Sequence, residues 1–106
     1  MKSFAAAIRI SPDGRYLYAS NRGADNIAAF AVDSEDGTLE SIGFFPSHGR
    51  WPRDFCISPD GCFIVIANQN SNNLVVCRRD VKSGVIGEVV NEAQVPLPVS
   101  VLWYKN

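Results

Sequence analysis

The chain has 106 residues, of which 46% are hydrophobic, and its formal net charge is −1 at pH 7. That hydrophobic content indicates a packed globular domain and excludes a disordered chain. With no basic stripe to displace counterions from phosphates, we expect no nucleic-acid partner. The longest strongly apolar run, Phe63–Ala67, is far shorter than the roughly 20 residues of a membrane-spanning helix, so we expect no membrane partner.

The first half of the chain predicts four short β-strands. Val, Ile, Phe and Tyr dominate the apolar runs, and no segment carries apolar residues at helical spacing. Ser11-Pro12-Asp13-Gly14 is a turn, because proline presets φ and glycine tolerates a positive φ. Asp36-Gly37 forms a second turn. The predicted strands are 6–10, 15–20, 26–32 and 38–45.

The second half repeats the first at a fixed offset of 47 residues. Ile10–Gly14 returns as Ile57–Gly61, and the same register aligns Asn21 with Asn68 and Gly37 with Gly84. A fixed period of this length is typical of repeat folds. The predicted strands of this half are 54–57, 62–67, 73–78 and 85–90, and the last has room to extend.

Four antiparallel strands in about 45 residues are typical of a blade of a β-propeller. Cys62–Ala67 is apolar without alternation, which indicates a sheet covered on both faces. We therefore predict an all-β fold, a β-propeller fragment with two four-stranded antiparallel blades and a C-terminal strand from a further blade. The division is 1–47, 48–96 and 97–106. A two-sheet β-sandwich is the alternative, which the internal repeat disfavours.

The three cysteines form no C-x-x-C pair. Cys56 and Cys62 flank a tight turn and could form a disulfide, but their counterparts in the repeat are arginines, so we favour free thiols. Cys77 replaces Phe30 in the repeat and is expected to be a small core residue. One histidine and scattered carboxylates give no metal-ligand spacing, and we expect no metal or cofactor. The N-terminus shows no signal-like apolar stretch, so we expect a soluble, cytoplasmic protein.

Longer motifs suggest a family. Residues 8–23 read IRISPDGRYLYASNRG, Pro52-Arg53-Asp54-Phe55 precedes the second turn, residues 67–71 read ANQNS, and 95–103 read VPLPVSVLW. This pattern resembles the lactonase family of seven-bladed β-propellers, which includes enzymes of the 6-phosphogluconolactonase and carboxymuconate-lactonizing types. The resemblance implies hydrolysis of a sugar lactone such as 6-phosphogluconolactone, with a small-molecule lactone as the partner.

Seven blades of 47 residues need about three times this length, so we expect the chain to be the C-terminal portion of such a propeller. Each blade buries its faces against neighbours. We therefore expect either self-association or further blades to cover the open faces.

Arg22 and Arg53 are the candidate catalytic residues. Propeller topology places the loops at 21–22, 48–53 and 68–70 at one end of the ring, where polar groups converge. The resemblance implies that these arginines clamp the substrate anion and stabilise the oxyanion of the attacked lactone carbonyl. The alternatives are a surface salt bridge from Arg22 to Asp25 or to another acidic residue at the same end of the blade, and an ion pair between Arg53 and a neighbouring carboxylate.

The candidate substrate-binding residues are Asn21, Asn68, Gln69 and His48. His48 is the only histidine and could act as a base, or it is simply a solvated loop residue. Asn21 and Asn68 occupy equivalent repeat positions, which also fits a structural role at strand ends. Gln69 replaces Arg22 in the repeat, which favours a ligand contact.

The site implied by the resemblance is incomplete in this chain. Ala7 stands where an acidic residue is expected in many family members, and the acid or base would come from other blades. We therefore expect the chain to be inactive by itself. The alternative is a non-catalytic propeller module for binding or assembly.

Overall fold

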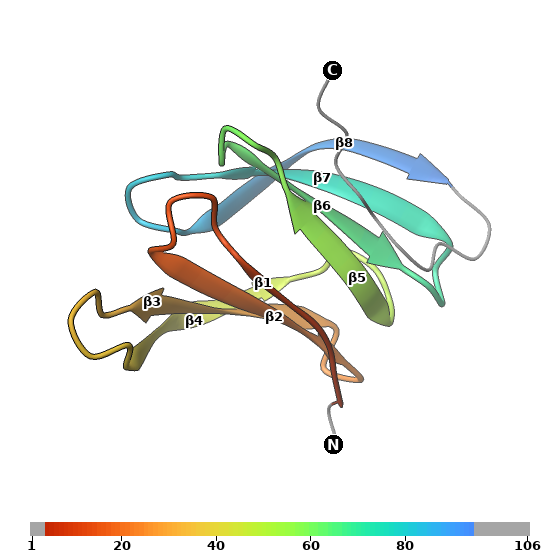
Figure 1. Ribbon diagram of the computed structural model, residues 1–106. Helices are drawn as coiled ribbons and strands as arrows, with labels where there is room; N and C mark the ends of the chain where they lie inside the picture. The colour runs from red at the N-terminus through yellow and green to blue at the C-terminus, as the bar shows by residue number, and fades with distance from the viewer. Residues whose placement is uncertain (1–3, 95–106) are drawn as a thin grey trace.

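The computed structural model describes residues 4–94, which form two four-stranded antiparallel sheets (Figure 1). Within these residues there is no helix, and so none that could span a membrane. The all-β prediction and the two antiparallel sheets are confirmed; the strand expected in 97–106 lies outside the described residues. The first sheet contains β1 (Phe4–Ile10), β2 (Tyr16–Arg22), β3 (Asn26–Val32) and β4 (Leu39–Pro46). The second contains β5 (Pro52–Ile57), β6 (Phe63–Asn68), β7 (Asn73–Arg79) and β8 (Ile86–Gln94).

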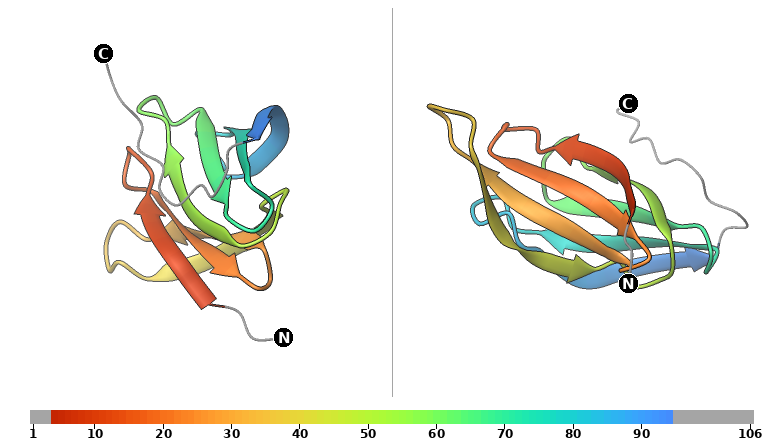
Figure 2. Two further views of the ribbon diagram at one scale, coloured as in Figure 1. Left: turned by 90° about the vertical axis from the view of Figure 1, so that its right-hand side faces the viewer. Right: turned by 90° about the horizontal axis from the view of Figure 1, so that it is seen from below.

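Each sheet runs up and down in sequence order, and the two sheets meet at their first strands. β5 contacts both β1 and β2, whereas β4 and β8 lie on opposite sides of the molecule (Figure 1). The sheets are thus separate layers that diverge from β1 and β5 (Figure 2). This is the arrangement of adjacent propeller blades, with β1 and β5 innermost.

The repeated turn is built by the same hydrogen bonds in both sheets. The Ser11 hydroxyl donates to Asp13 Oδ1 (2.6 Å), and that oxygen also accepts from the Arg15 amide (3.0 Å). Ser58 and Asp60 repeat the hydroxyl contact at 2.6 Å. Because these bonds hold the carboxylate in its charged form, the pKa values of Asp13 and Asp60 are lowered.

The predicted strands are all present, and their ends lie within two residues of the expectation except that of β8, which the sequence left room to extend. β5 begins at Pro52, two residues earlier than predicted, because Pro52 pairs with Asn68 before a register shift that ends at Asp54. β8 continues to Gln94 because β7 pairs with it as far as Asn73. Sequence patterns do not reveal such cross-strand pairing.

The main core lies between the two sheets. The first sheet contributes alternating residues of β2 and β3, and the second contributes alternating residues of β6 and β7 together with one residue each from β5 and β8. These are Tyr16, Tyr18, Ile27 and Ala29, and Phe55, Ile64, Ile66, Val75, Cys77 and Ile86. The expectation that Cys77 is a core residue is confirmed. All three cysteines are free thiols, and burial raises the pKa of Cys77 to about 11.

A buried polar contact joins the two sheets at the turn between β7 and β8. The Tyr18 hydroxyl donates to the Gly84 carbonyl (2.6 Å) and accepts from Arg79 Nε (2.7 Å). Arg79 Nη1 donates to the Gly61 carbonyl (2.9 Å). Burial raises the pKa of Tyr18, and the hydrogen bond from Arg79 opposes that rise. Buried polar groups of one sheet are thus satisfied by the other.

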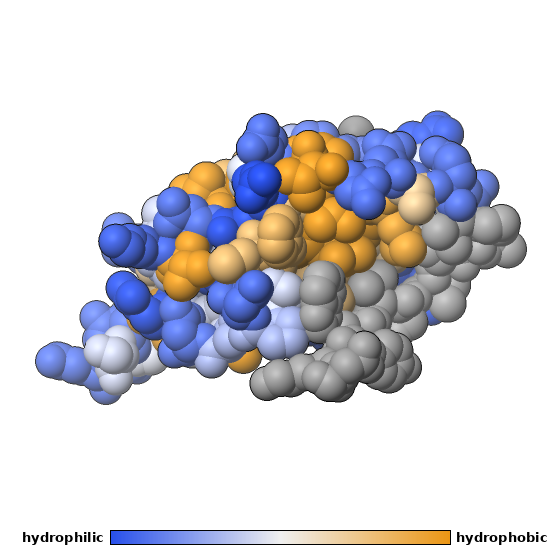
Figure 3. Space-filling view, turned by 90° about the horizontal axis from the view of Figure 1, so that it is seen from above, coloured by the Kyte–Doolittle hydropathy of each residue, from blue (hydrophilic) through white to orange (hydrophobic). Residues whose placement is uncertain are grey.

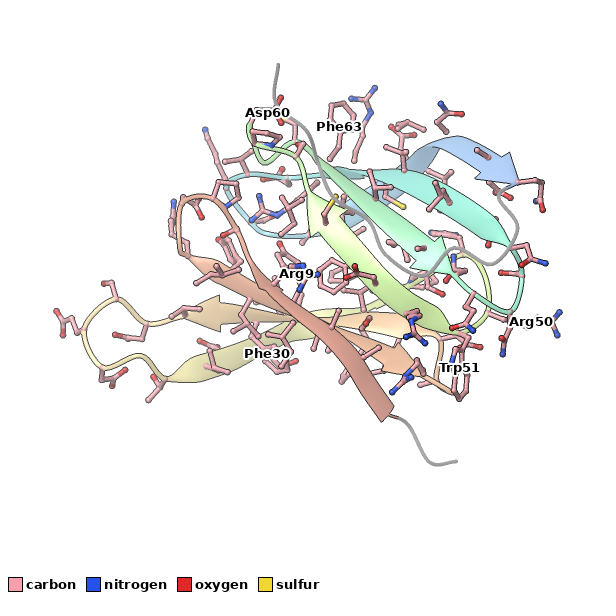
Figure 4. The ribbon with its side chains drawn as sticks, turned by 45° about the vertical axis from the view of Figure 1, so that its right-hand side comes forward. Arg9, Phe30, Arg50, Trp51, Asp60 and Phe63 are labelled. Carbon is pink, nitrogen blue, oxygen red and sulfur yellow. The ribbon has the colours of Figure 1, made fainter. Side chains whose placement is uncertain are left out.

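The sheet faces that point away from this core are also apolar. Ile8, Ile10 and Leu39 are 59%, 57% and 52% exposed. At the 47-residue offset they correspond to Phe55, Ile57 and Ile86, which pack into the core between the sheets. Apolar side chains also gather on the outer face of the second sheet (Figure 3, orange), where Phe63 points away from the first sheet (Figure 4).

Candidate functional site

An open cavity of about 630 Å³ lies at the innermost strands. It is lined by Ala6, Ala7, Ile8, Arg9, Arg22, Arg53 and Asp54. β1 and β5 supply all of these residues except Arg22, which ends β2. The structure therefore brings both candidate catalytic arginines to one cavity.

Backbone irregularities shape the cavity wall. Both innermost strands shift register here, β1 between Ala5 and Ile8 and β5 between Pro52 and Asp54. Within the first shift, the Ala7 amide donates to the Ser20 hydroxyl (3.1 Å). Bulges of this kind are common beside functional sites, where they redirect side chains. Ala7 is the repeat counterpart of Asp54, and its small side chain leaves space on the β1 side.

The charges of the cavity are mainly positive. Arg9, Arg22 and Arg53 line it together with one carboxylate, that of Asp54. Arg9 Nη2 lies 2.7 Å from Asp54 Oδ1, which also accepts from the Phe55 amide (2.9 Å). Arg9 lies between the two sheets beside the inner strands (Figure 4). An anionic group entering the cavity meets an excess of guanidinium groups, the geometry that binds carboxylates and phosphates.

Arg22 packs on an indole ring. Its Cζ lies 5.6 Å from the centroid of the Trp51 ring, and its Nε is buried without a hydrogen-bond partner. Among residues 4–94, the ion pairs join Arg9 to Asp54 and Arg78 to Glu88, and none joins Arg22 to Asp25, whose Oδ1 accepts from the Trp51 amide at 2.8 Å. No local sequence pattern predicts this contact between Arg22 and Trp51.

Arg53 is exposed at the start of β5 and reaches toward the end of β6. Its Nη1 lies 3.4 Å from Gln69 Oε1, a long hydrogen bond. The backbone N–H of Gln69 also donates to the Trp51 carbonyl (3.0 Å), and the backbone N–H of Asn70 donates to the Arg50 carbonyl (3.0 Å). The loops at 48–53 and 68–70 are therefore joined.

The remaining candidates make structural contacts outside the cavity lining. Asn21 Nδ2 donates to Asn26 Oδ1 (2.9 Å), and the fully buried Asn68 donates to the Ser47 carbonyl (2.9 Å). The side chain of His48 is exposed, and its carbonyl accepts from Asn73 Nδ2 (3.2 Å). Substrate binding by Asn21, Asn68, Gln69 and His48 stays a prediction.

Arg9 and Asp54 are not among the site residues that the sequence predicts. The Pro-Arg-Asp-Phe motif could have identified Asp54 as a site residue. The repeat gives no such signal for Arg9, because its counterpart is Cys56. Their ion pair joins β1 to β5, and no local pattern encodes it. Among residues 4–94, no group of three His, Cys, Asp or Glu side chains could hold a metal ion.

Two up-and-down sheets that diverge from their inner strands are the arrangement of two adjacent blades of a β-propeller, and a cationic cavity lies at those inner strands. The family model described as "Lactonase, 7-bladed beta-propeller" matches residues 1–103. The chain belongs to this lactonase family.

Relatives of known structure or name agree with this membership. The chain is 47% identical over 90 residues to a 6-phosphogluconolactonase of Formosa agariphila, covering 83% of this chain and 26% of that protein. It is 38% identical over 99 residues to the 6-phosphogluconolactonase of Bacillus subtilis, covering 93% of this chain and 28% of that protein. The periplasmic gluconolactonase PpgL of Pseudomonas aeruginosa superposes with a TM-score of 0.89 at 41% identity, covering 92% and 27%. The chain thus spans about a quarter of the length of these relatives.

Proposed function

We propose that this chain forms part of a lactonase that hydrolyses an anionic sugar lactone such as 6-phosphogluconolactone. The observation that carries the proposal is the convergence of Arg9, Arg22 and Arg53 on one cavity at the inner strands. The names of the relatives support the reaction class, since two of them are called 6-phosphogluconolactonase.

The arginines have a direct role in this chemistry. Water attacks the ring carbonyl and gives up a proton to a base, the carbonyl carbon becomes tetrahedral, and the carbonyl oxygen takes up negative charge; the proton is returned to the ring oxygen when it leaves. Collapse of this intermediate breaks the ring C–O bond and leaves a carboxylic acid, which ionises, and a hydroxyl group. We assign Arg22 and Arg53 to the anionic groups of substrate and intermediate, which guanidinium groups bind bidentately.

The part of the cavity that residues 4–94 form is lined by one carboxylate, that of Asp54, whose Oδ1 accepts from Arg9 and from the Phe55 amide. We expect the general base that takes the proton from water to come from another blade. We therefore expect only background hydrolysis from these 106 residues by themselves.

The test is a chimaera in which this chain replaces the segment that it matches in the B. subtilis relative. Hydrolysis of 6-phosphogluconolactone is measured at neutral pH with the spontaneous rate subtracted. Arg22→Ala and Arg53→Ala should each lower kcat/KM about ten- to a hundredfold, the effect of losing a charged hydrogen bond.

Arg50→Ala is the matched control, because Arg50 lies in the connection from β4 to β5, just before Arg53, and its side chain points outward (Figure 4). It should change kcat/KM less than about twofold. A folded chimaera whose turnover is unaffected by Arg22→Ala and Arg53→Ala would exclude the proposed roles.

A second candidate is a propeller module that binds an anion without catalysis. The paired state of Asp54 favours it. A folded chimaera that binds 6-phosphogluconate in an arginine-dependent way, yet shows no hydrolysis above background, identifies this case.

A cytoplasmic location also stays a prediction, and one similar solved protein is named a periplasmic gluconolactonase.

A further inference from the structure

Trp51 adopts a backbone conformation that is unusual for a bulky residue. Its φ is 65°, in the left-handed region where aromatic side chains are rarely found. It lies in the connection from β4 to β5, directly before β5 (Figure 4). A strained residue persists where its surroundings hold it firmly, and such residues cluster at functional sites.

Both sheets hold the Trp51 backbone. Its amide donates to Asp25 Oδ1 at 2.8 Å, from the turn between β2 and β3. Its carbonyl accepts from the Gln69 amide at 3.0 Å, directly after β6. Pro52, which follows, is buried. The Trp51 backbone is therefore fixed at the junction of the two blades.

The ring in turn restricts Arg22. The guanidinium lies 5.6 Å from the ring centroid, within the range of a cation–π contact. Arg22 Nε is buried and has no hydrogen-bond partner. The contact therefore leaves the terminal nitrogens as the part of Arg22 available to a ligand in the cavity that this residue lines.

We propose that Trp51 is a positioning residue that holds the Arg22 guanidinium ready for the anionic group of the substrate. This inference rests on the proposed function, because it assumes that Arg22 binds an anion. An arginine held in place before binding loses less side-chain freedom when its ligand arrives, so the affinity for the anion rises.

The test is isothermal titration calorimetry of the full 106-residue chain with inorganic phosphate. Trp51→Leu should weaken phosphate binding about fivefold, the scale of a partly desolvated cation–π contact. Trp51→Phe retains an aromatic face and should stay within about twofold of the parent. Arg22→Ala should weaken binding about tenfold or more, and Arg50→Ala should leave it unchanged.

A second measurement reports the ring contact without any ligand. The Nε–H resonance of Arg22 in a ¹⁵N-edited NMR spectrum should be shifted upfield by the indole ring and exchange slowly with water. In Trp51→Leu it should move to the position of an exposed arginine, while backbone amide dispersion shows that the chain remains folded.

The outcomes separate the two claims. If Arg22→Ala weakens phosphate binding and Trp51→Leu does not, the positioning role is overturned and the anion role of Arg22 stands. If phosphate does not bind, or Arg22→Ala leaves its binding unchanged, the proposed function loses its anion contact and the inference falls with it. An Arg22 Nε–H resonance that is unchanged in folded Trp51→Leu overturns the positioning role on its own.

Discussion

Gly84 and Gly37 occupy equivalent positions in the two repeats, and their replacement by alanine provides a test of the contact between the blades. Both have a positive φ, 75° for Gly84 and 74° for Gly37. A Cβ on Gly37 meets nothing within 4 Å, whereas a Cβ on Gly84 would lie 2.5 Å from Tyr16 Cδ1 and 2.8 Å from Cε1. The two substitutions therefore share the backbone cost and differ in the collision with Tyr16.

The expected free-energy costs follow from these two terms. A left-handed conformation costs an alanine about 1–2 kcal/mol, so Gly37→Ala should lower the free energy of unfolding by that amount. Gly84→Ala should cost about 1–3 kcal/mol more, the range for overpacking a close contact. The total cost of Gly84→Ala is a large share of the free energy of unfolding of a typical domain, which is about 5–15 kcal/mol.

Urea unfolding followed by far-UV circular dichroism measures both variants. With an m value of about 1–3 kcal/mol per M, an extra cost of about 2 kcal/mol lowers the midpoint by roughly 1 M. The double variant Tyr16→Ala/Gly84→Ala should show coupling, because removing the ring removes the collision. Equal midpoints for Gly37→Ala and Gly84→Ala would refute the packing of Tyr16 on Gly84.

Three further predictions concern the contact between the blades and the outer faces. Arg79→Met should lower the free energy of unfolding by about 3 kcal/mol, since it leaves buried partners of Arg79 unpaired; a urea midpoint equal to that of the parent would contradict this. Because the pKa of Tyr18 is raised in the folded state, its stabilising contribution is complete below about pH 10 and is lost as the pH rises through the folded pKa. Urea titrations at a series of pH values should show that decline, and Tyr18→Phe should reduce it. Ile8→Glu should lower the self-association seen by sedimentation velocity at micromolar concentration, because Ile8 is 59% exposed on the outer face of the first sheet; a monodisperse parent monomer would contradict the expected association.

Local chemistry explains why so much of the fold could be predicted from the sequence. The Ser-Pro-Asp-Gly turn is specified by contacts within five residues, such as Ser11 with Asp13 and the Tyr16 amide with the Ser11 hydroxyl. The repeat then places the same strands in both halves. Strand ends such as Pro52 and Gln94 depend on pairing with another strand, so local patterns locate them poorly.

The candidate site was only partly predictable for the same reason. Arg22 and Arg53 were found because they sit in recognisable motifs at strand ends. The ion pair between Arg9 and Asp54 joins residues 45 positions apart, and each strand has a register shift just before or at the paired residue. The proposed role of Trp51 depends on its positive φ angle, which the local sequence Arg-Trp-Pro does not predict.

The correspondence between the two sheet faces has a geometric consequence. Ile8 and Ile10 face outward at the positions where Phe55 and Ile57 face inward. The outer face of the first sheet is therefore different from the outer face of the second sheet. Any contact that continues this stacking between molecules is heterologous and has a direction, and it cannot close as a two-fold dimer. Such assemblies grow head to tail, and the rotation per step alone decides whether they end as a closed ring or continue as a filament.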